Sequence, residues 1–535
     1  MKRRSLLLAF FSLVIVFISA LPLFAAQSLT FRMESEIPAL DPQKSNSAPS
    51  FTIGYHVFDN LVRVHKGKLM PAAATKWVIS PDGKTYTFTL RDAKWSDGKP
   101  VTARDFEYGF KRLLDPKTAA EYAFAAYYIK GAQDYNLGKN KDANSVGVKA
   151  VNDKTLVINL TNPTPYFLAY LGYNCFAPAR EDLVKKYGDT YMGAADKAVF
   201  NGPFILKEWK HEQKKILAKN PNYWNAKNIK LDNVEILVIA DPNTTLNMFE
   251  NGELGFSDLP SNLYKQYEAK GEARVFYNGA TDWMKINVRK NPQKPWLSNA
   301  DFRRAIAYAI DRESYCNVST KGLYTPSLRY VLPLVHGVNK NYGDEYPLAF
   351  YPAKGNLPKA KAYLKKALSD LKISDPSKIT VEYLIQDLDE TRLMSEVLQQ
   401  QLEKNLGIKV KIKLVTRKQR ADMEKKGQYD AVYHGWMPDY DDPMTYMEIW
   451  QGNSSQNNSG YKNPQYDKLI QAAMVEKDAK KRMDTLFKAE KILLEDAPLI
   501  PLQIRRKAWL KDPRLAGLDR PLIGAEYDFM TASFK

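Results

Sequence analysis

The chain has 535 residues, of which 44% are hydrophobic and 12% aromatic, and it carries a formal charge of +18 at pH 7. It is too long for one ordinary core and too apolar to be disordered, so we expect a globular protein of two to four domains. The basic residues are spread along the chain without a dense arm or a nucleic-acid motif, which argues against nucleic-acid binding.

The N-terminus is predicted to be a secretory signal peptide. Residues 2–4 are basic, residues 6–24 are almost wholly apolar, and residues 25–26 are small. An uncleaved membrane anchor is the alternative, because a large apolar residue stands where the cleavage site prefers a small one. No other segment is long and apolar enough to span a bilayer, so we expect an exported, soluble protein.

Cysteine usage narrows the compartment. Cys175 and Cys316 are the only cysteines, and neither follows the apolar stretch closely enough to carry a lipid anchor at a new N-terminus. We therefore expect a protein that is free in the periplasm and not tethered to an outer face. Two cysteines do not build a disulfide scaffold, and whether they pair stays open.

The first clear elements are a strand and a helix. Polar and apolar residues alternate over residues 85–90, after the turn Pro81-Asp82-Gly83, which predicts a half-buried strand. The sequence Thr102-Ala103-Arg104-Asp105 is typical of a capped helix start. The residues that follow it place apolar side chains on one helical face, at Phe106, Phe110 and Leu114.

Later segments continue this mixture. Strands are predicted at 156–160, 234–239 and 408–414, and helices at 298–310 and 391–407. We therefore predict an α/β protein. No repeat or long flexible linker separates the segments, which favours domains that exchange chain segments, as suits a molecule that closes around a ligand.

An acidic aromatic run lies near the C-terminal end of this basic chain, from Gly435 to Pro443. An ionised carboxylate is costly to bury unless it is paired, so an Asp in such a run is suited to bind the ammonium group of a ligand. A solvated turn bounded by Pro438 and Pro443 is the alternative. Asp441 and Asp442 are adjacent, so their side chains usually diverge, and we expect turn and cap residues there instead of a catalytic pair.

Catalytic and metal-binding motifs have little support. The five histidines show no metal-ligand spacing, and no phosphate-binding glycine loop or nucleophile elbow is present, so we expect no metal and no cofactor. Ser96 and Lys99 have the Ser-x-x-Lys spacing of penicillin-interacting enzymes, but they lie in a glycine turn before Pro100. A structural turn is expected, and a secreted serine enzyme that uses Ser96 and Lys99 is the alternative.

Six segments together resemble one known family. They are Leu40-Asp41-Pro42, Asp92 to Gly98 with Val101-Thr102-Ala103, Asn201-Gly202-Pro203-Phe204, Asn220 to Trp224, Phe302 to Ile306 with Ile310-Asp311-Arg312, and the run that begins Gly435-Trp436. In this order they resemble the extracytoplasmic solute-binding proteins of family 5, and most closely the oligopeptide-binding proteins of ABC transporters. The resemblance covers nearly all of the chain after the signal peptide.

The resemblance implies a three-lobed α/β fold of the periplasmic-binding-protein type (type II), in which two lobes enclose the ligand. The expected divisions are the signal peptide (1–26), a discontinuous lobe I (27–58, 196–280 and 505–535), lobe II (59–195) and lobe III (281–504). The protein is expected to be a monomer that performs no bond chemistry. It would trap short peptides and deliver them to the permease subunits of an ABC importer.

A peptide-binding site is implied as well. Asp439 matches the carboxylate that pairs with the peptide α-ammonium, and Tyr122 matches a ring that packs beside it. The stretch Gly435-Trp436-Met437 matches residues that pair with the peptide backbone, with the Trp436 ring as the wall of a side-chain pocket. Main-chain groups of Asn46 and Ala48 match the opposite backbone contacts by strand addition. The structural alternatives are a turn cap for Asp439, core positions for the rings, and a surface loop for Asn46 and Ala48.

The site departs from the family where the peptide's C-terminal carboxylate is expected. Oligopeptide binders of enteric bacteria carry an arginine at the position of Tyr433 and a histidine at that of Asp389. Arg417, Lys425 or another lysine is the expected substitute. We predict that this end of the site is lined by Tyr433, His434, Arg417 and Asp389.

Other functions remain open at this point. Members of the family also bind dipeptides, metal complexes such as nickel, haem or sugars. Asp439 favours a ligand with a free ammonium, and the lack of a histidine cluster argues against a metal complex. A basic surface adhesin is a further alternative, and it would bind polyanions in a salt-dependent way.

Overall fold

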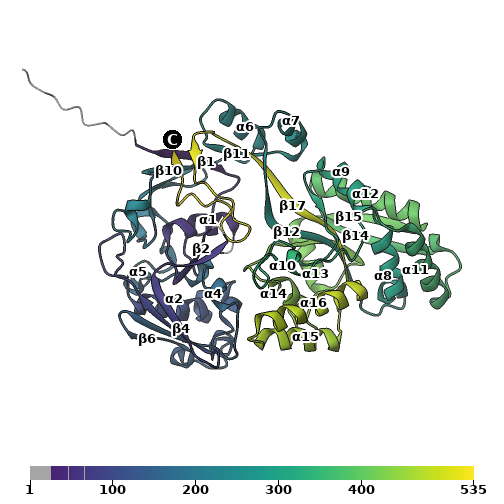
Figure 1. The fold of residues 1–535 in the computed structure, drawn as a ribbon, viewed down its shortest axis with the longest axis horizontal. Helices are drawn as coiled ribbons and strands as arrows, with labels where there is room; N and C mark the ends of the chain where they lie inside the picture. Colours follow the sequence, from purple (N-terminus) through teal and green to yellow (C-terminus); the bar gives the residue numbers. More distant parts are fainter. Residues whose placement is uncertain (1–25, 46, 66) are drawn as a thin grey trace, which may run out of the picture.

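Two bodies, each built around its own sheets, make up the described part of the chain. The structure, a computed structural model, describes residues 26–45, 47–65 and 67–535. One body holds mainly elements of the first half of the chain and the other mainly elements of the second half (Figure 1). The predicted signal peptide lies, up to residue 25, outside the described residues. No helix in the described ranges is long and apolar enough to cross a membrane.

A four-stranded sheet joins distant parts of the chain in the first body. Its strands are, in order, β1 (Ser28–Met33), β10 (Asn233–Val238), β9 (Lys214–Lys219) and β8 (Phe204–Lys210). β10 confirms the strand predicted over 234–239. Phe31 is fully buried on the core face of β1 and packs on Phe529, with ring centroids 5.8 Å apart. The start, middle and end of the chain therefore share one core.

A second sheet of the first body contains the strand and helix that the sequence predicts most clearly. Its strands are, in order, β4 (Ala74–Ile79), β5 (Thr85–Leu90), β7 (Thr155–Asn159) and β6 (Val148–Asn152). β5 confirms the alternating strand, and α2 (Ala103–Leu114) confirms the helix after it. Thr102 and Asp105 form the expected capping box. Phe106 and Phe110 are fully buried where α2 packs on the sheet.

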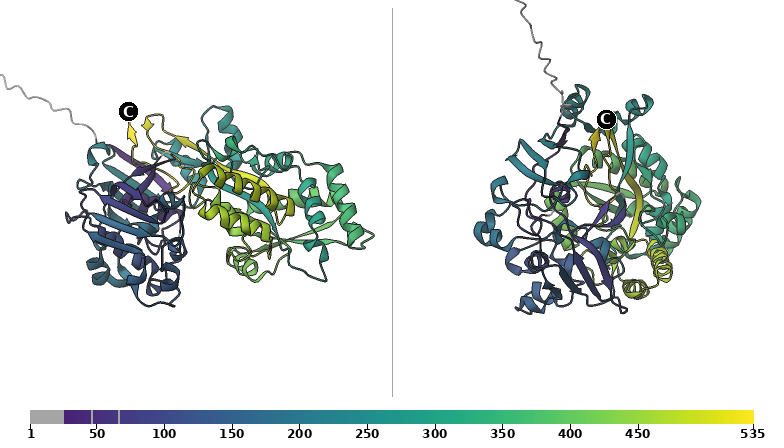
Figure 2. Two further views of the ribbon diagram at one scale, coloured as in Figure 1. Left: turned by 60° about the horizontal axis from the view of Figure 1, so that its bottom comes forward. Right: turned by 60° about the vertical axis from the view of Figure 1, so that its left-hand side comes forward.

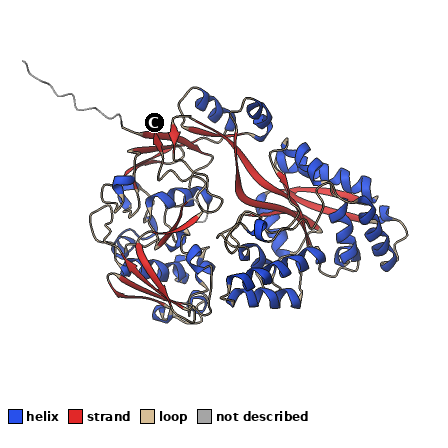
Figure 3. Cartoon of the chain, viewed as in Figure 1, coloured by secondary structure: helices blue, strands red, loops and turns tan. Residues whose placement is uncertain are grey.

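The second body is built on a seven-stranded sheet. Its strands are, in order, β11 (Phe256–Leu259), β17 (Leu499–Lys511), β12 (Arg274–Ile286), β16 (Ala431–Trp436), β14 (Thr380–Gln386) and β15 (Lys409–Val415), with β13 (Thr325–Pro326) beside β17. The long strands β12 and β17 cross between the bodies (Figure 3). Trp509 of β17 packs in the same core as Phe31, whereas Leu502 packs in the core of the second body. The two bodies are therefore joined by continuous strands.

Helices cover this sheet. They are α8 (Ala300–Ala309), α9 (Arg312–Thr320), α10 (Tyr342–Glu345), α11 (Leu357–Asp370), α12 (Asp389–Leu406), α13 (Arg417–Lys426), α14 (Met444–Met447), α15 (Pro464–Val475) and α16 (Ala479–Asp496). The last two lie side by side, in yellow-green in Figure 2. The predicted helix over 391–407 begins two residues early and ends at Gly407, whose φ of +70° suits glycine.

The remaining elements complete a mixed α/β fold, as predicted. They are α1 (Ala48–Val57), β2 (Val62–His65), β3 (Lys68–Pro71), α3 (Ala132–Asn136), α4 (Phe167–Tyr170), α5 (Glu181–Tyr187), α6 (Pro242–Glu250), α7 (Tyr264–Ala269), β18 (Leu515–Ala516) and β19 (Ser533–Phe534). Cys175 and Cys316 are buried and do not form a disulfide. The lobe boundaries given above stay a prediction.

Asp41 and Arg303, which belong to two of the segments that carry the family resemblance, each join distant parts of the chain. Arg112 on α2 donates from Nη1 and Nη2 to the two carboxylate oxygens of Asp41, at 2.7 and 2.5 Å. Arg303 on α8 donates from Nη2 to the carbonyl of Asp496 at the end of α16, at 2.6 Å. Both guanidinium groups are buried, so each satisfies polar groups that water does not reach.

Candidate functional site

The two bodies meet at a cluster of tyrosines around a half-buried carboxylate. Tyr128 of the first body and Tyr440 of the second each donate a hydrogen bond to Glu448, at 2.8 Å. Tyr166 stacks on Tyr440, and Tyr170 packs edge-on against the same ring. Burial raises the pKa of Glu448 to about 6, although the two tyrosine hydroxyls oppose this rise. A half-buried acid therefore lies at the point where the bodies touch.

Asp439 lies beside this cluster, and its charge is not compensated. Burial, with a smaller effect from Glu448, raises the pKa of Asp439 to about 7. Within the described ranges, no group forms a hydrogen bond or an ion pair with its carboxylate oxygens. The rings around it are Tyr122, Tyr170 and Tyr173, whose pKa values are raised by burial and further by the Asp439 carboxylate. A ligand cation would meet an acid without a competing partner.

The neighbouring acids of the run are already satisfied. Arg482 on α16 donates to both carboxylate oxygens of Asp442, at 2.6 and 2.8 Å, and both side chains are buried. Asp442 also accepts from the N–H of Met444 at the start of α14. Asp441 accepts from the backbone N–H of His336 at 2.8 Å. These two acids act as cap and turn residues, as expected, with a buried ion pair in addition.

A threonine fixes the run between β16 and Asp439. The hydroxyl of Thr445 accepts from the indole Nε1 of Trp436 at 3.3 Å and from the backbone N–H of Asp439 at 3.2 Å. Gly435 is required by packing, because a Cβ there would lie 2.2 Å from Oδ1 of Asp282. Trp436 is half-buried.

The strand that precedes Asp439 has an open edge. β16 pairs with β12 over its whole length, from Ala431 to Trp436. On its other side, β14 pairs only with Ala431 and Val432. Residues 433–436 have no strand neighbour on that side within the part of the chain that the structure describes. Such an edge can pair with an extended peptide that adds as a further strand.

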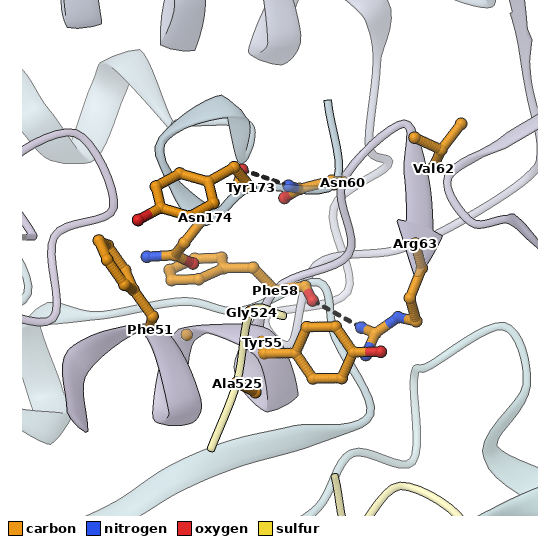
Figure 4. A pocket seen from close by; sticks show the side chains of 12 residues that line it. Phe51, Tyr55, Phe58, Asn60, Val62, Arg63, Tyr173, Asn174, Gly524 and Ala525 are labelled. Carbon is orange, nitrogen blue, oxygen red and sulfur yellow. Dashed lines mark hydrogen bonds between the residues drawn. The ribbon is translucent and has the colours of Figure 1, made fainter. Parts of the chain in front are cut away.

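Two adjoining hollows lie next to Asp439. Asp439 and Tyr440 line the first, which holds about 60 Å³ of free volume and also reaches Tyr55 and Tyr173. Tyr55 and Tyr173 line the second hollow as well, and Figure 4 shows it from close by. There Asn60 donates to the carbonyl of Tyr173 at 2.7 Å, which anchors one wall. The aromatic walls offer apolar space beside a negative charge.

The residues predicted to bind the N-terminal half of the peptide differ in where they lie. Tyr122 lies beside Asp439, and Met437, which is 43% exposed, follows the open edge. Ala48 is the first residue of α1, so it offers a first-turn N–H and not an extended strand. Asn46 lies outside the described residues.

The residues predicted for the other end also differ in position. Tyr433 is buried, and His434 is half-buried beside it on β16. Arg417 and Lys425 are exposed on α13, and Asp389 is exposed in the first turn of α12. The structure does not bring the three exposed side chains into contact with β16.

Four residues at or near the site were not predicted from the sequence: Tyr128, Tyr440, Glu448 and Arg420. Tyr440 is part of the acidic aromatic run and was visible there, and Glu448 lies eight residues later, directly after α14. No spacing rule links either residue to Tyr128, which is more than 300 positions away in the chain. Arg420 is half-buried and donates from Nη1 to the backbone carbonyl of Tyr433 at 2.9 Å, whereas Arg417, one turn earlier on α13, is exposed.

The Ser-x-x-Lys spacing belongs to a structural turn, as predicted. The hydroxyl of Ser96 accepts from the backbone N–H of Phe200 at 3.1 Å, and Nζ of Lys99 pairs with Asp182 at 3.1 Å. The two functional groups therefore have separate partners. In the described ranges, no group of three or more His, Cys, Asp or Glu side chains gathers as a metal site.

Comparisons with known proteins give consistent matches. The model of bacterial extracellular solute-binding proteins, family 5 Middle, matches residues 68–458. Over 519 residues the chain is 34% identical to the oligopeptide-binding protein OppA of Bacillus subtilis, covering 95% of this chain and 93% of that protein. It is 33% identical to the dipeptide-binding protein DppE of the same species, covering 92% and 89%. The structure of Listeria monocytogenes OppA bound to peptide matches with a TM-score of 0.77 at 31% identity, covering 95% and 99%.

Proposed function

The chain belongs to the bacterial extracellular solute-binding proteins of family 5, and we propose that it binds short peptides and delivers them to the membrane permease of an ABC importer. The fold is the α/β fold of periplasmic-binding-protein type that this family shares. The protein acts in the periplasm as a carrier and not as an enzyme.

The observation that carries this proposal is the uncompensated carboxylate of Asp439. A half-buried acid whose pKa is raised to about 7 is stabilised by a cation that enters its pocket. The α-ammonium of a peptide is such a cation, and it donates up to three charge-assisted hydrogen bonds. The open edge of residues 433–436 supplies the main-chain partners that an extended peptide needs next to its ammonium.

Backbone recognition explains how one site accepts many sequences. Main-chain N–H and C=O groups are common to all peptides, so a strand edge binds them without reading side chains. The hollows beside Asp439 leave room for the first side chains and for water that satisfies their polar groups. Trp436 provides the apolar wall of one such space.

Ligand binding is coupled to closure of the two bodies. Asp439 belongs to the second body, whereas Tyr122 and Tyr173 belong to the first, so an ammonium beside Asp439 contacts both. A ligand that contacts both bodies only when they touch shifts the equilibrium toward the closed arrangement. We propose that β12 and β17, which run between the bodies, bend when the bodies close.

Native mass spectrometry of gently purified protein tests the proposal. We expect a distribution of co-purified masses that fragment as short peptides, and their loss from an Asp439→Asn variant purified in parallel. A single non-peptide mass retained by both proteins would contradict it.

A dipeptide carrier is the second candidate, because the chain is 33% identical to a dipeptide-binding protein. The same experiment separates the two, since co-purified masses would then correspond to two residues only.

A further inference from the structure

Glu448 joins the two bodies at a point next to the candidate site. Its Oε2 accepts from the hydroxyl of Tyr128 in the first body, and its Oε1 accepts from that of Tyr440 in the second, each at 2.8 Å. The carboxylate therefore holds one donor from each body. Another hydrogen bond across the contact runs from Lys477 to the carbonyl of Pro81, but both residues are exposed, so water competes for these groups.

The charged groups that face Glu448 leave one acid beside it without a partner. Arg482 on α16 donates to both carboxylate oxygens of Asp442, so this pair carries no net charge. The remaining charged group is Asp439, and the charge of Glu448 contributes to the raised pKa of Asp439. Within the described ranges, four tyrosines that stay neutral, because burial raises their pKa values, complete the surroundings: Tyr128, Tyr166, Tyr170 and Tyr440.

Glu448 and Asp439 both hold protons in mildly acidic solution. Burial raises the pKa of Glu448 to about 6 and that of Asp439 to about 7. Near pH 6 the ligand-free protein therefore carries protons on both groups. Repulsion between neighbouring acids is mutual, so a cation that neutralises one acid makes the other easier to ionise. The α-ammonium of a peptide at Asp439 acts in this way, and the released protons pass to the solvent.

Ionisation of Glu448 strengthens its contact with the first body. A hydroxyl that donates to an ionised carboxylate forms a charge-assisted hydrogen bond, which is roughly twice as strong as one between neutral groups. A protonated Glu448 accepts from the same hydroxyls only as a neutral group. The hydrogen bond from Tyr128 is therefore strongest when a ligand cation is present at Asp439. Because Tyr128 and Glu448 belong to different bodies, this strengthening favours the closed arrangement.

We propose that Glu448 holds the two bodies together when a peptide binds: it loses its proton as the ammonium pairs with Asp439, and the ionised carboxylate then binds the hydroxyl of Tyr128. Glu448 is a positioning residue, because it acts through Tyr128 and Asp439. This inference rests on the proposed function and adds a regulation of the same site, since closure responds to the charge at the N-terminus of the ligand.

Calorimetry at pH 6 in two buffers of different ionisation enthalpy counts the protons released when tetra-alanine binds. At this pH, acids with pKa values of about 7 and about 6 hold about 0.9 and about 0.5 of a proton. We therefore expect wild-type protein to release more than one proton per peptide. Glu448→Gln should release less than one, because Asp439 is then the acid that titrates.

Tyr128→Phe separates the hydrogen bond from the proton. This variant loses the hydroxyl that crosses between the bodies and keeps both acids. We expect it to release more than one proton, as wild type does, but to bind tetra-alanine about tenfold or more weakly, as for a hydrogen bond to a charged group. Tyr346→Phe is the matched control, because Tyr346 donates to Asp484 at the same 2.8 Å within the second body. Its affinity and proton release should equal those of wild type.

The outcomes separate this inference from the proposed function. If wild type and Glu448→Gln release the same number of protons, Glu448 does not respond to the ligand, and the inference is wrong while peptide binding stands. The same holds if Tyr128→Phe binds tetra-alanine as tightly as wild type. If wild-type protein binds none of dialanine, tetra-alanine and hexa-alanine, both the inference and the proposed function fail.

Discussion

Tyr166 and Tyr440 stack face to face across the contact between the two bodies, with ring centroids 4.9 Å apart and ring planes inclined by 7°. Their contact closes over Glu448, whose carboxylate accepts from Tyr440, and lies beside Asp439. Stacked aromatic pairs contribute about 0.5–1.5 kcal/mol beyond the area they bury. This pair therefore favours the closed arrangement, in which the two rings lie next to Glu448 and Asp439.

Removing the Tyr440 ring should weaken closure. We expect Tyr440→Ala to reduce the affinity for tetra-alanine about tenfold or more, because stacking and burial are lost together. Tyr440→Phe keeps the ring and loses only the hydroxyl, so its effect should be smaller. Small-angle scattering should show a larger radius of gyration for the alanine variant with peptide present. Tyr363→Ala, which removes a ring stacked on Tyr308 within the second body, is the matched control. Equal scattering curves and affinities for wild-type and Tyr440→Ala would argue against a role in closure.

Asp439→Asn should weaken peptides with a free N-terminus far more than acetylated ones. Loss of one partner of a buried charge pair costs about 2–5 kcal/mol, so we expect a loss of about 30-fold or more for tetra-alanine. N-acetyl-tetra-alanine has no ammonium and should bind weakly and equally to both proteins. Asp441→Asn serves as the matched control, because Asp441 lines the same hollow as Asp439 but its carboxylate accepts from the backbone N–H of His336. Calorimetry that finds the same affinity ratio for both peptides in wild type and variant would exclude Asp439 as the ammonium partner.

Peptide affinity should depend on pH through Asp439. The pKa of this acid is raised to about 7 in the ligand-free protein, so its ionised fraction grows as the pH rises through 7. The α-ammonium of the peptide loses its proton near pH 8. We therefore expect the affinity for tetra-alanine to be greatest between about pH 7 and 8 and to fall on both sides. Asp439→Asn should lose the acidic side of this profile, and a profile that keeps it would assign the titration to another group.

The same pKa makes a prediction for stability. Because the folded protein holds the Asp439 proton up to about pH 7 and the unfolded chain releases it near pH 4, ligand-free stability should fall as the pH rises between these values. The Asp439→Asn variant avoids this loss. Thermal melts without peptide should therefore show the variant above wild type at pH 8 and level with it at pH 3.5. A variant that melts below wild type at pH 8 would show that the carboxylate is stabilised by a partner.

Local patterns predicted much of the fold. Alternation over 85–90 and the capping box of Thr102 and Asp105 are properties of neighbouring residues, and both elements formed where expected. The pairing of strands that lie far apart in the chain could not be predicted from the sequence. Nothing in the sequence of β1 indicates that it runs parallel to β10, because the pairing depends on a core shared with the C-terminal end of the chain.

The residues of the candidate site also differ in whether the sequence could identify them. The acidic aromatic run could be singled out from the sequence, but only the family resemblance distinguished Asp439 from Asp441 and Asp442, and its role stays a prediction. Tyr128 and Tyr166 could not be singled out, since their role depends on how two bodies meet. The contact of Arg420 with β16 could not be predicted from the sequence either. Arg417 and Arg420 are three residues apart on α13, and only the packing of that helix shows which of them reaches β16.

The buried ion pair of Arg482 and Asp442 fixes the segment from Gly435 to Pro443, and we expect it to make a large contribution to the stability of the fold. Arg482→Met leaves Asp442 buried without its partner, which costs about 3–5 kcal/mol for such pairs. We expect a clear loss of thermal stability. Peptide affinity should also fall, because Asp442 accepts from the backbone N–H of Met444 and so fixes the segment that continues from Asp439. Arg482→Met combined with Asp442→Asn removes both charges and should recover part of the stability. Lys480→Met, at an exposed ion pair on the same helix, should change stability by less than about 1 kcal/mol. If the single Arg482→Met variant is as stable as the double variant, the carboxylate of Asp442 has found other partners and the ion pair does not hold the run.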